Sequence, residues 1–126
     1  MKTAAQGVVK QADAVQRHQV TAGTATQYQV LVGPDDRAPH FALRRFIMGP
    51  GGGMPRHVNT VEHEQYVLRG RARVSIGETV HEVGPDTALL IPAGVPHDYQ
   101  VLEAPFEFIC VVPNAEDSVT LCGDEP

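Results

Sequence analysis

The sequence has too few basic residues and too few cysteines for several common functions. Its 126 residues include ten Lys or Arg against fifteen Asp or Glu, and only two Cys. The formal net charge of −5 argues against nucleic acid as the partner, because phosphate binding requires a surplus of basic side chains. Cys110 and Cys122 form no Cys-x-x-Cys pair, so neither a disulfide framework nor a thiolate zinc site is indicated. We expect both thiols to be reduced.

Long apolar segments are also absent. No apolar run approaches the roughly 18 residues of a membrane span. The segment from Met1 to Lys10 lacks the apolar centre of a signal peptide. We therefore expect a cytoplasmic protein that binds neither a membrane nor nucleic acid.

Glycine and proline, by contrast, are frequent. The 12 Gly and 10 Pro lie between short apolar runs, and short strands separated by such turns about every 8–12 residues are typical of an all-β sandwich or barrel. The glycine-rich residues 49–53 lack the Lys-Ser/Thr ending of a phosphate loop, so we expect a β-turn there. The expected strands are Tyr28–Val32, Phe41–Met48, Gln65–Leu68, Arg71–Ile76, Thr79–Val83, Thr87–Ile91, His97–Leu102 and Phe106–Val112.

The length predicts one domain with a single hydrophobic core. We expect the barrel to occupy residues 26–115. Residues 1–25 hold few large apolar groups and are expected to form an extension that is mobile or packs on a partner subunit, with a short helix at Lys10–Arg17. Residues 116–126 are expected to form a C-terminal tail.

Three of the six histidines share a geometric pattern. His57 and Asn59 are two residues apart, which places them on one face of a strand, and His63, six residues from His57, returns to that face if the strand register continues. His97 follows Pro92–Pro96, a stretch that predicts a rigid turn into a new strand. This layout can bring three imidazoles and an amide together inside a barrel, although a single buried histidine is more often a core residue. The other three histidines are expected on the surface: His18, His40 and His81.

Two segments resemble the two motifs of the cupin family. Residues 53–70 (GMPRHVNTVEHEQYVLRG) resemble the first motif, G-x(3–5)-H-x-H-x(3–4)-E-x6-G. Residues 84–97 (GPDTALLIPAGVPH) resemble the second, whose firm part is P-x-G-x-x-H. With the flanking strands, the resemblance covers residues 30–113. It implies a single-domain cupin, a double-stranded β-helix or jelly-roll barrel that binds a metal. It says little about the substrate, because one fold hosts many functions.

The first motif departs from the family pattern at two positions. Asn59 stands in place of the second histidine, and His63 in place of the glutamate. Glu62 and Glu64 miss that spacing by one residue, and such a shift turns a side chain to the other face. The histidine in place of glutamate resembles a subgroup of small bacterial cupins that use four histidines. The resemblance implies one divalent transition metal per chain (Mn, Fe, Ni, Co or Zn), bound by His57, His63 and His97, with Asn59 as a weak fourth ligand or as a partner of metal-bound water.

Strand parity predicts the side chains that surround the metal. Gln65 and Val67 follow His63 on its face, and Tyr99 follows His97. Phe108 and Cys110 share a face of the last strand. We expect each of these to be a core residue, and contact with the substrate is the alternative. Tyr99 and Glu64 are the candidates to move protons during a reaction.

A basic row lies on an expected strand and consists of Arg69, Arg71 and Arg73, with Arg44 and Arg45 nearby. We expect these arginines on an exposed or interface face, and attraction of an anionic substrate is the alternative.

These residues leave three functions open. The leading prediction is a metal-dependent, dioxygenase-like oxidoreductase acting on a small organic molecule, because a labile metal position beside an apolar wall suits a chelating substrate and oxygen. A metal acting as a Lewis acid suits an isomerase or lyase for a sugar acid or hydroxy-carbonyl compound equally well. The third function is a small-molecule-binding module without turnover.

Since open barrels expose strand edges and small cupins commonly pair through N-terminal strands, the resemblance also implies a homodimer formed through residues 20–48.

Overall fold

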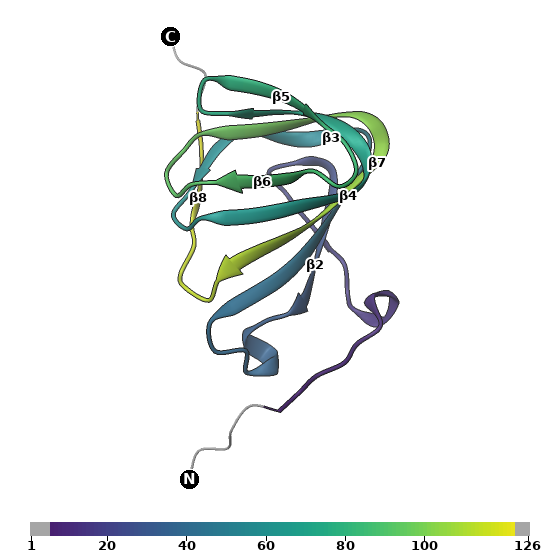
Figure 1. Ribbon diagram of the computed structural model, residues 1–126, viewed down its shortest axis with the longest axis vertical. Helices are drawn as coiled ribbons and strands as arrows, with labels where there is room; N and C mark the ends of the chain where they lie inside the picture. Colours follow the sequence, from purple (N-terminus) through teal and green to yellow (C-terminus); the bar gives the residue numbers. More distant parts are fainter. Residues whose placement is uncertain (1–5, 123–126) are drawn as a thin grey trace.

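Antiparallel strands make up nearly all of the fold. The computed structural model describes residues 6–122, and these contain no α-helix, which confirms the all-β prediction. No helix among them is long and apolar enough to cross a membrane. The strands are β1 (His18–Gln19), β2 (Thr24–Val32), β3 (Phe41–Asn59), β4 (His63–Ile76), β5 (Thr79–Val83), β6 (Ala88–Ile91), β7 (His97–Pro113) and β8 (Val119–Leu121), with two 3-10 turns at Ala12–Ala14 and Pro34–Asp36 (Figure 1).

Three long strands replace most of the short strands that the sequence predicted. The expected turn at residues 49–53 is wrong, because β3 continues through it as a β-bulge. Glycine makes this possible: Gly53 has a φ of 152°, and a Cβ there would lie 2.1 Å from the carbonyl oxygen of Tyr99 on β7. Gly70 likewise allows β4 to bend, because a Cβ at this position would lie 2.2 Å from the carbonyl oxygen of Pro105. Glycine therefore bends these strands without ending them.

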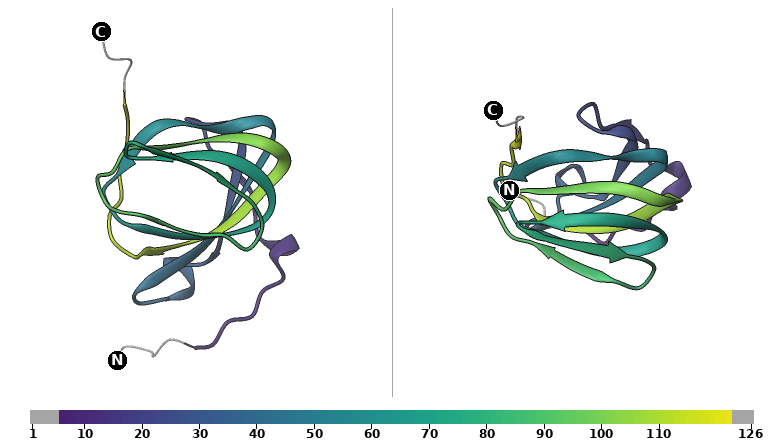
Figure 2. Two further views of the ribbon diagram at one scale, coloured as in Figure 1. Left: turned by 45° about the horizontal axis from the view of Figure 1, so that its top comes forward. Right: turned by 90° about the horizontal axis from the view of Figure 1, so that it is seen from above.

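The bent strands run through two layers of the barrel. β7 pairs with β3 on one side and with β4 on the other along most of its length. The first half of β3 pairs with β2, and its last residues pair with β8. The first residues of β4 pair with β6, and its second half pairs with β5. The strands therefore curve around a common interior (Figure 2).

The hydrophobic core fills one part of that interior. Its buried side chains come from the inward-facing positions of the long strands and include Met48, Val67, Ala72, Val74, Phe106 and Phe108. Alternation along β3, β4 and β7 directs every second side chain inward. The same alternation brings the buried polar residues, described below, to the other part of the interior.

Both ends of the described chain are attached to the barrel. The helix expected at Lys10–Arg17 is only the 3-10 turn Ala12–Ala14. This turn is held by the buried Gln29, whose Nε2 donates to the carbonyl oxygens of Ala12 (2.8 Å) and Val15 (2.9 Å). At the other end the sheet continues beyond residue 115, because β8 pairs with β3 from His57 to Asn59. Residues 1–5 of the expected extension and 123–126 of the expected tail lie outside the described residues.

Candidate metal centre

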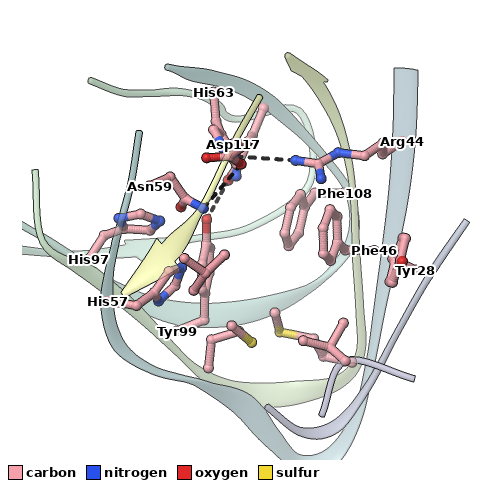
Figure 3. Close-up of a pocket in the computed structure, with 15 residues that line it drawn as sticks. Tyr28, Arg44, Phe46, His57, Asn59, His63, His97, Tyr99, Phe108 and Asp117 are labelled. Carbon is pink, nitrogen blue, oxygen red and sulfur yellow. Dashed lines mark hydrogen bonds and ion pairs between the residues drawn. The ribbon is translucent and has the colours of Figure 1, made fainter. Parts of the chain in front are cut away.

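Three long strands bring the predicted histidines to one end of the barrel interior. His57 on β3 and His97 on β7 are direct cross-strand neighbours, and their ring centres are 4.2 Å apart. His63 begins β4, with its ring centre 6.4 Å from that of His97. Asn59 follows His57 on the same face of β3. All four side chains are buried, with at most 6% exposure, and Figure 3 shows them facing the same cavity.

Backbone carbonyls orient two of the imidazoles. The Nδ1 of His57 donates to the carbonyl oxygen of Pro55 at 2.7 Å, and the Nδ1 of His97 donates to that of Val95 at 2.9 Å. Because a carbonyl oxygen only accepts, Nδ1 carries the proton in both rings and Nε2 keeps its lone pair. This second hydrogen bond is typical of metal-binding histidines. In both cases the carbonyl belongs to the residue two positions earlier.

His63 has a different environment. Its Nδ1 lies 3.4 Å from Cys110 Sγ and 3.5 Å from Arg44 Nη2. Its Nε2 is buried without a hydrogen-bond partner, as is the Oδ1 of Asn59. A buried polar atom left unsatisfied costs about 1–3 kcal/mol. A cation between these two atoms would satisfy both.

The donor set fits a divalent transition metal, although the rings are not closed around one point. Within residues 6–122, no three His, Cys, Asp or Glu side chains form a preassembled metal cluster. Two imidazoles bound to one ion at about 2.1 Å have ring centres roughly 4.5–6.5 Å apart, and the observed distances of 4.2 and 6.4 Å lie near this range. Neutral imidazole suits zinc, iron, nickel and copper. Small side-chain rotations would therefore complete the site.

Burial keeps two of these histidines neutral. Desolvation is the main cause that lowers the pKa of His63 to about 4, and the positive charge of Arg44 lowers it further against the opposing effect of Asp117. Desolvation is likewise the main cause that lowers the pKa of His97 to about 4, against the opposing hydrogen bond to Val95. Both rings are therefore unprotonated at neutral pH, which is the form that binds a metal.

The histidines open into a cavity of about 250 Å³ with an aromatic wall. Tyr99 stacks on Phe108 with ring centres 5.4 Å apart, and Phe108 stacks on Phe46 at 5.1 Å. Tyr28 continues the row at 5.9 Å from Phe46. A cavity of about 150 Å³ holds benzene, so this cavity has room for a small cyclic molecule packed against these four rings.

Tyr99 connects the aromatic wall to the histidines. Its ring meets that of His97 edge to face at 5.9 Å, and its hydroxyl donates to Gln65 Oε1 at 2.9 Å. Burial raises the pKa of Tyr99 well above its usual value. The hydroxyl therefore keeps its proton and can act as a hydrogen-bond donor in the cavity.

Arg44 also lines the cavity, which corrects its expected place on an exposed face. Its guanidinium lies over the ring of Phe46, 5.2 Å from the ring centre, and its Nη2 is 3.7 Å from Cys110 Sγ. Arg44 forms no ion pair with any carboxylate within residues 6–122, and its buried Nε has no partner. Before the bulge of β3 at residues 49–53, the even-numbered positions face inward, whereas the adjacent Arg45 faces outward and pairs with Glu107.

Three predicted pocket residues do not line the cavity. Glu64 is exposed on the outer face of β4, one residue out of phase with His63, and a hydrogen bond with Glu62 is the main cause that raises its pKa. Its position does not support a role in proton transfer inside the barrel. Val67 is fully buried in the core. Cys110 is fully buried behind His63, and burial raises the pKa of its thiol. Gln65, Tyr99 and Phe108 do line the cavity.

The remaining histidines lie where the sequence predicted. His18, His40 and His81 are all exposed, and none lines the cavity. No sequence pattern indicated Asp117, however, which lies beyond the expected end of the barrel and yet reaches the cavity. Its Oδ2 is 3.6 Å from His63 Nε2 (Figure 3).

The chain belongs to the cupin domain family, whose model matches residues 44–112. This match confirms the resemblance that the two sequence motifs carry. None of the curated proteins compared matches the sequence.

Solved structures share the fold over most of the chain. The polyketide cyclase RemF from Streptomyces resistomycificus is 28% identical, with a TM-score of 0.85, and the match covers 95% of this chain and 88% of that one. A cupin 2 domain-containing protein from Halorhodospira halophila is also 28% identical, with a TM-score of 0.73 over 79% of this chain and 71% of that one. A single-residue variant of oxalate decarboxylase from Bacillus subtilis is 21% identical, with a TM-score of 0.70 over 86% of this chain and 30% of that one. Some structural neighbours are therefore enzymes.

Proposed function

We propose that this protein is a metal-dependent enzyme that cyclises a small, enolisable carbonyl compound bearing an anionic group. The observation that carries the proposal is one cavity with unsatisfied metal-ligand atoms at one end and a row of aromatic rings beside them. Similarity to a polyketide cyclase over 95% of the chain supports this reaction class.

The proposed metal ligands are His57, His63 and His97, with Asn59 directed at the same space. The ion is one of Mn, Fe, Ni, Co or Zn, because neutral imidazole ligands do not distinguish these metals. When bound, it would act as a Lewis acid on a carbonyl oxygen of the substrate. A divalent ion would make the site positive, since the imidazoles and the amide are neutral and Asp117 is the only acid among the described residues that line the cavity. The site would therefore favour an anion.

The other residues of the cavity bind and orient the substrate. The stacked rings of Tyr99, Phe108 and Phe46 provide a flat apolar surface for a cyclic product and exclude water from it. Arg44, which has no carboxylate partner among residues 6–122, is placed to pair with an anionic substituent. The Tyr99 hydroxyl, now bonded to Gln65, can donate to a substrate oxygen instead.

The reaction forms a carbon–carbon bond within one molecule. An activated carbon attacks a carbonyl carbon, and one hydrogen and the resulting hydroxyl leave together as water. The product therefore weighs one water less than the substrate and contains no added oxygen. This mass balance distinguishes cyclisation from the oxygenase reaction.

The test uses purified protein, stripped of metal and reloaded separately with Mn, Fe, Ni, Co or Zn. Each form is incubated with aryl 1,5-dicarbonyl acids, in which the enolisable carbon and the second carbonyl can close a six-membered ring, and with their amides. Product mass and oxygen consumption are recorded. We expect a product lighter by one water, no oxygen consumption, and faster turnover of the acids. Product formation that is equal in the metal-free protein would contradict the proposal.

An oxygenase remains the second candidate, and the apolar rings beside the imidazoles favour it. In that case oxygen consumption matches product formation, and the product gains oxygen atoms. Ligand binding without any product, whichever metal is supplied, would instead point to a binding module.

We also propose a homodimer formed through residues 20–48. Phe41 at the start of β3 is 64% exposed, which is unusual for a large aromatic side chain. Light scattering at micromolar concentration should give twice the mass of the chain, and Phe41→Ser should weaken the association. A monomer in the parent protein would contradict this arrangement.

A further inference from the structure

We propose that Asp117 binds the same metal ion as the histidines, as the one carboxylate ligand of the site. This inference rests on the metal binding proposed above. Among the described residues that line the cavity, Asp117 is the only acid. Since the three imidazoles and the amide are neutral, Asp117 would supply the only negative ligand charge.

The two carboxylate oxygens of Asp117 have different partners. Its Oδ1 accepts from the backbone N–H of Thr60 at 3.0 Å and lies 3.1 Å from the Thr60 hydroxyl. Its Oδ2 points the other way, toward Asn59 Nδ2 at 3.4 Å and His63 Nε2 at 3.6 Å. Asp117 is thus positioned through one oxygen, and its second oxygen faces the proposed ion.

The distance between Asp117 and His63 fits a shared ion better than a direct hydrogen bond. A hydrogen bond between nitrogen and oxygen is about 2.7–3.2 Å long, and 3.6 Å exceeds this. Two ligand atoms at about 2.1 Å from one ion are roughly 3.0–3.4 Å apart when the geometry is octahedral or tetrahedral. His63 Nε2 and Asn59 Oδ1 are both at least nine-tenths buried and unsatisfied beside this carboxylate. An ion at this position would give a partner to all three ligand atoms, namely Asp117 Oδ2, His63 Nε2 and Asn59 Oδ1.

The segment that carries Asp117 is anchored on the strand that carries two of the proposed ligands. β8 pairs with β3 through His57↔Leu121 and Asn59↔Val119. We name residues 114–118, which precede β8, the C-terminal strap. The strap is joined to β3 at Thr60, whose hydroxyl accepts from the backbone N–H of Ser118 at 3.0 Å. A bound ion would therefore tie the strap to the barrel through Asp117.

The test compares metal affinity in the full-length parent and three variants. Asp117→Ala removes the ligand, Asp117→Asn removes only its charge, and Glu116→Gln is the matched control, since Glu116 is exposed on the same strap. Affinities for Zn and Co are measured by competition with a chromophoric chelator. Loss of a group that merely orients a ligand costs about 10–100-fold in affinity, so we expect more than about 100-fold for Asp117→Ala, a smaller loss for Asp117→Asn, and none for Glu116→Gln.

Two further measurements distinguish a metal-binding residue from a residue with only a structural role. The visible spectrum of bound Co should change in Asp117→Ala, because the set of ligands changes. In the parent, addition of Zn should slow hydrogen exchange at residues 114–121, and this measurement needs no variant.

The possible failures are distinguishable. If the parent binds neither Zn nor Co, the proposed metal function is wrong. If the parent binds them, while Asp117→Ala shows the same affinity and the same Co spectrum, only the role of Asp117 is wrong. If Asp117→Ala does not fold, an unchanged exchange rate at residues 114–121 on adding Zn to the parent would overturn the inference.

Discussion

Arginine side chains on the outer face and in the interior of the barrel differ in their carboxylate partners. On the outer face Arg45 and Arg69 both pair with Glu107, and Arg71 pairs with Glu82. In the cavity, Arg44 has no carboxylate within pairing distance among residues 6–122. Arg44 and Arg45 are neighbours on β3, so strand alternation alone separates the two environments.

This difference agrees with the proposal that the cavity residues bind a ligand. A buried polar group without a partner costs free energy in the empty protein. Among the described residues, three of the four buried atoms without a partner lie at the cavity, namely Arg44 Nε, His63 Nε2 and Asn59 Oδ1, and the fourth, Gln29 Oε1, lies outside it. Their concentration in one cavity supports the proposal that a ligand binds there.

The largest expected effect is the loss of metal from His97→Ala. In elemental analysis of protein purified without a tag or chelator, the metal content should fall from about one ion per chain to background, because the variant lacks one of the three imidazole ligands. His81→Ala, on the outer face, should keep the full metal content. A metal content that is unchanged in His97→Ala would place the ion elsewhere.

Replacement of the adjacent arginines should give opposite results. Arg45→Met leaves the buried carboxylate of Glu107 with only Arg69, 3.7 Å away, and should lower the free energy of unfolding by about 1–3 kcal/mol. Arg44→Met should leave stability nearly unchanged or raise it, and weaken the binding of an aryl carboxylate about tenfold or more. Urea unfolding and calorimetry measure the two quantities. Equal stability losses in both variants would remove the distinction between the two faces.

A smaller effect is expected from acidification of the metal-free protein. The pKa of His63 and of His97 is about 4 in the folded protein, against about 6.5 in an unfolded chain. Between these values the unfolded chain binds more protons, so stability falls as the pH is lowered from 6.5 to 4. Thermal unfolding with a chelator present should show a lower Tm at pH 4.5 than at pH 6.5. His63→Leu should weaken this dependence, and a dependence equal to that of the parent would contradict the assignment.

The smallest effect is expected at Glu64. Because this side chain is exposed on the outer face, Glu64→Gln should change neither metal content nor turnover by more than about twofold, since isolated surface substitutions have little effect. A loss comparable to that of Arg44→Met would show that the outer face takes part in the reaction.

Much of the candidate site could be predicted from local patterns. His57 and Asn59 share a face of β3 because they are two residues apart, and His97, which follows the Pro92–Pro96 turn, pairs with His57. His63 begins the next strand, β4, so its approach to them depends on the tertiary structure. The same parity correctly placed Gln65, Tyr99 and Phe108 in the cavity. Parity could not show that the glycines at 49–53 bend β3 without ending it, because that depends on the approach of β7 to Gly53.

The sequence by itself determined the all-β fold, the family and the motif positions of the three histidines, since periodicity and motif spacing are local properties of the chain. Only the tertiary structure decided that Arg44 points inward without a carboxylate partner among the described residues, that Cys110 lies behind His63, and that Asp117 crosses to the cavity from beyond the expected barrel. The contacts of Cys110 with Arg44 and His63 join residues that are 66 and 47 positions apart in the sequence. Strand pairing creates such contacts through the bend of β3, the long course of β7 and the return of β8.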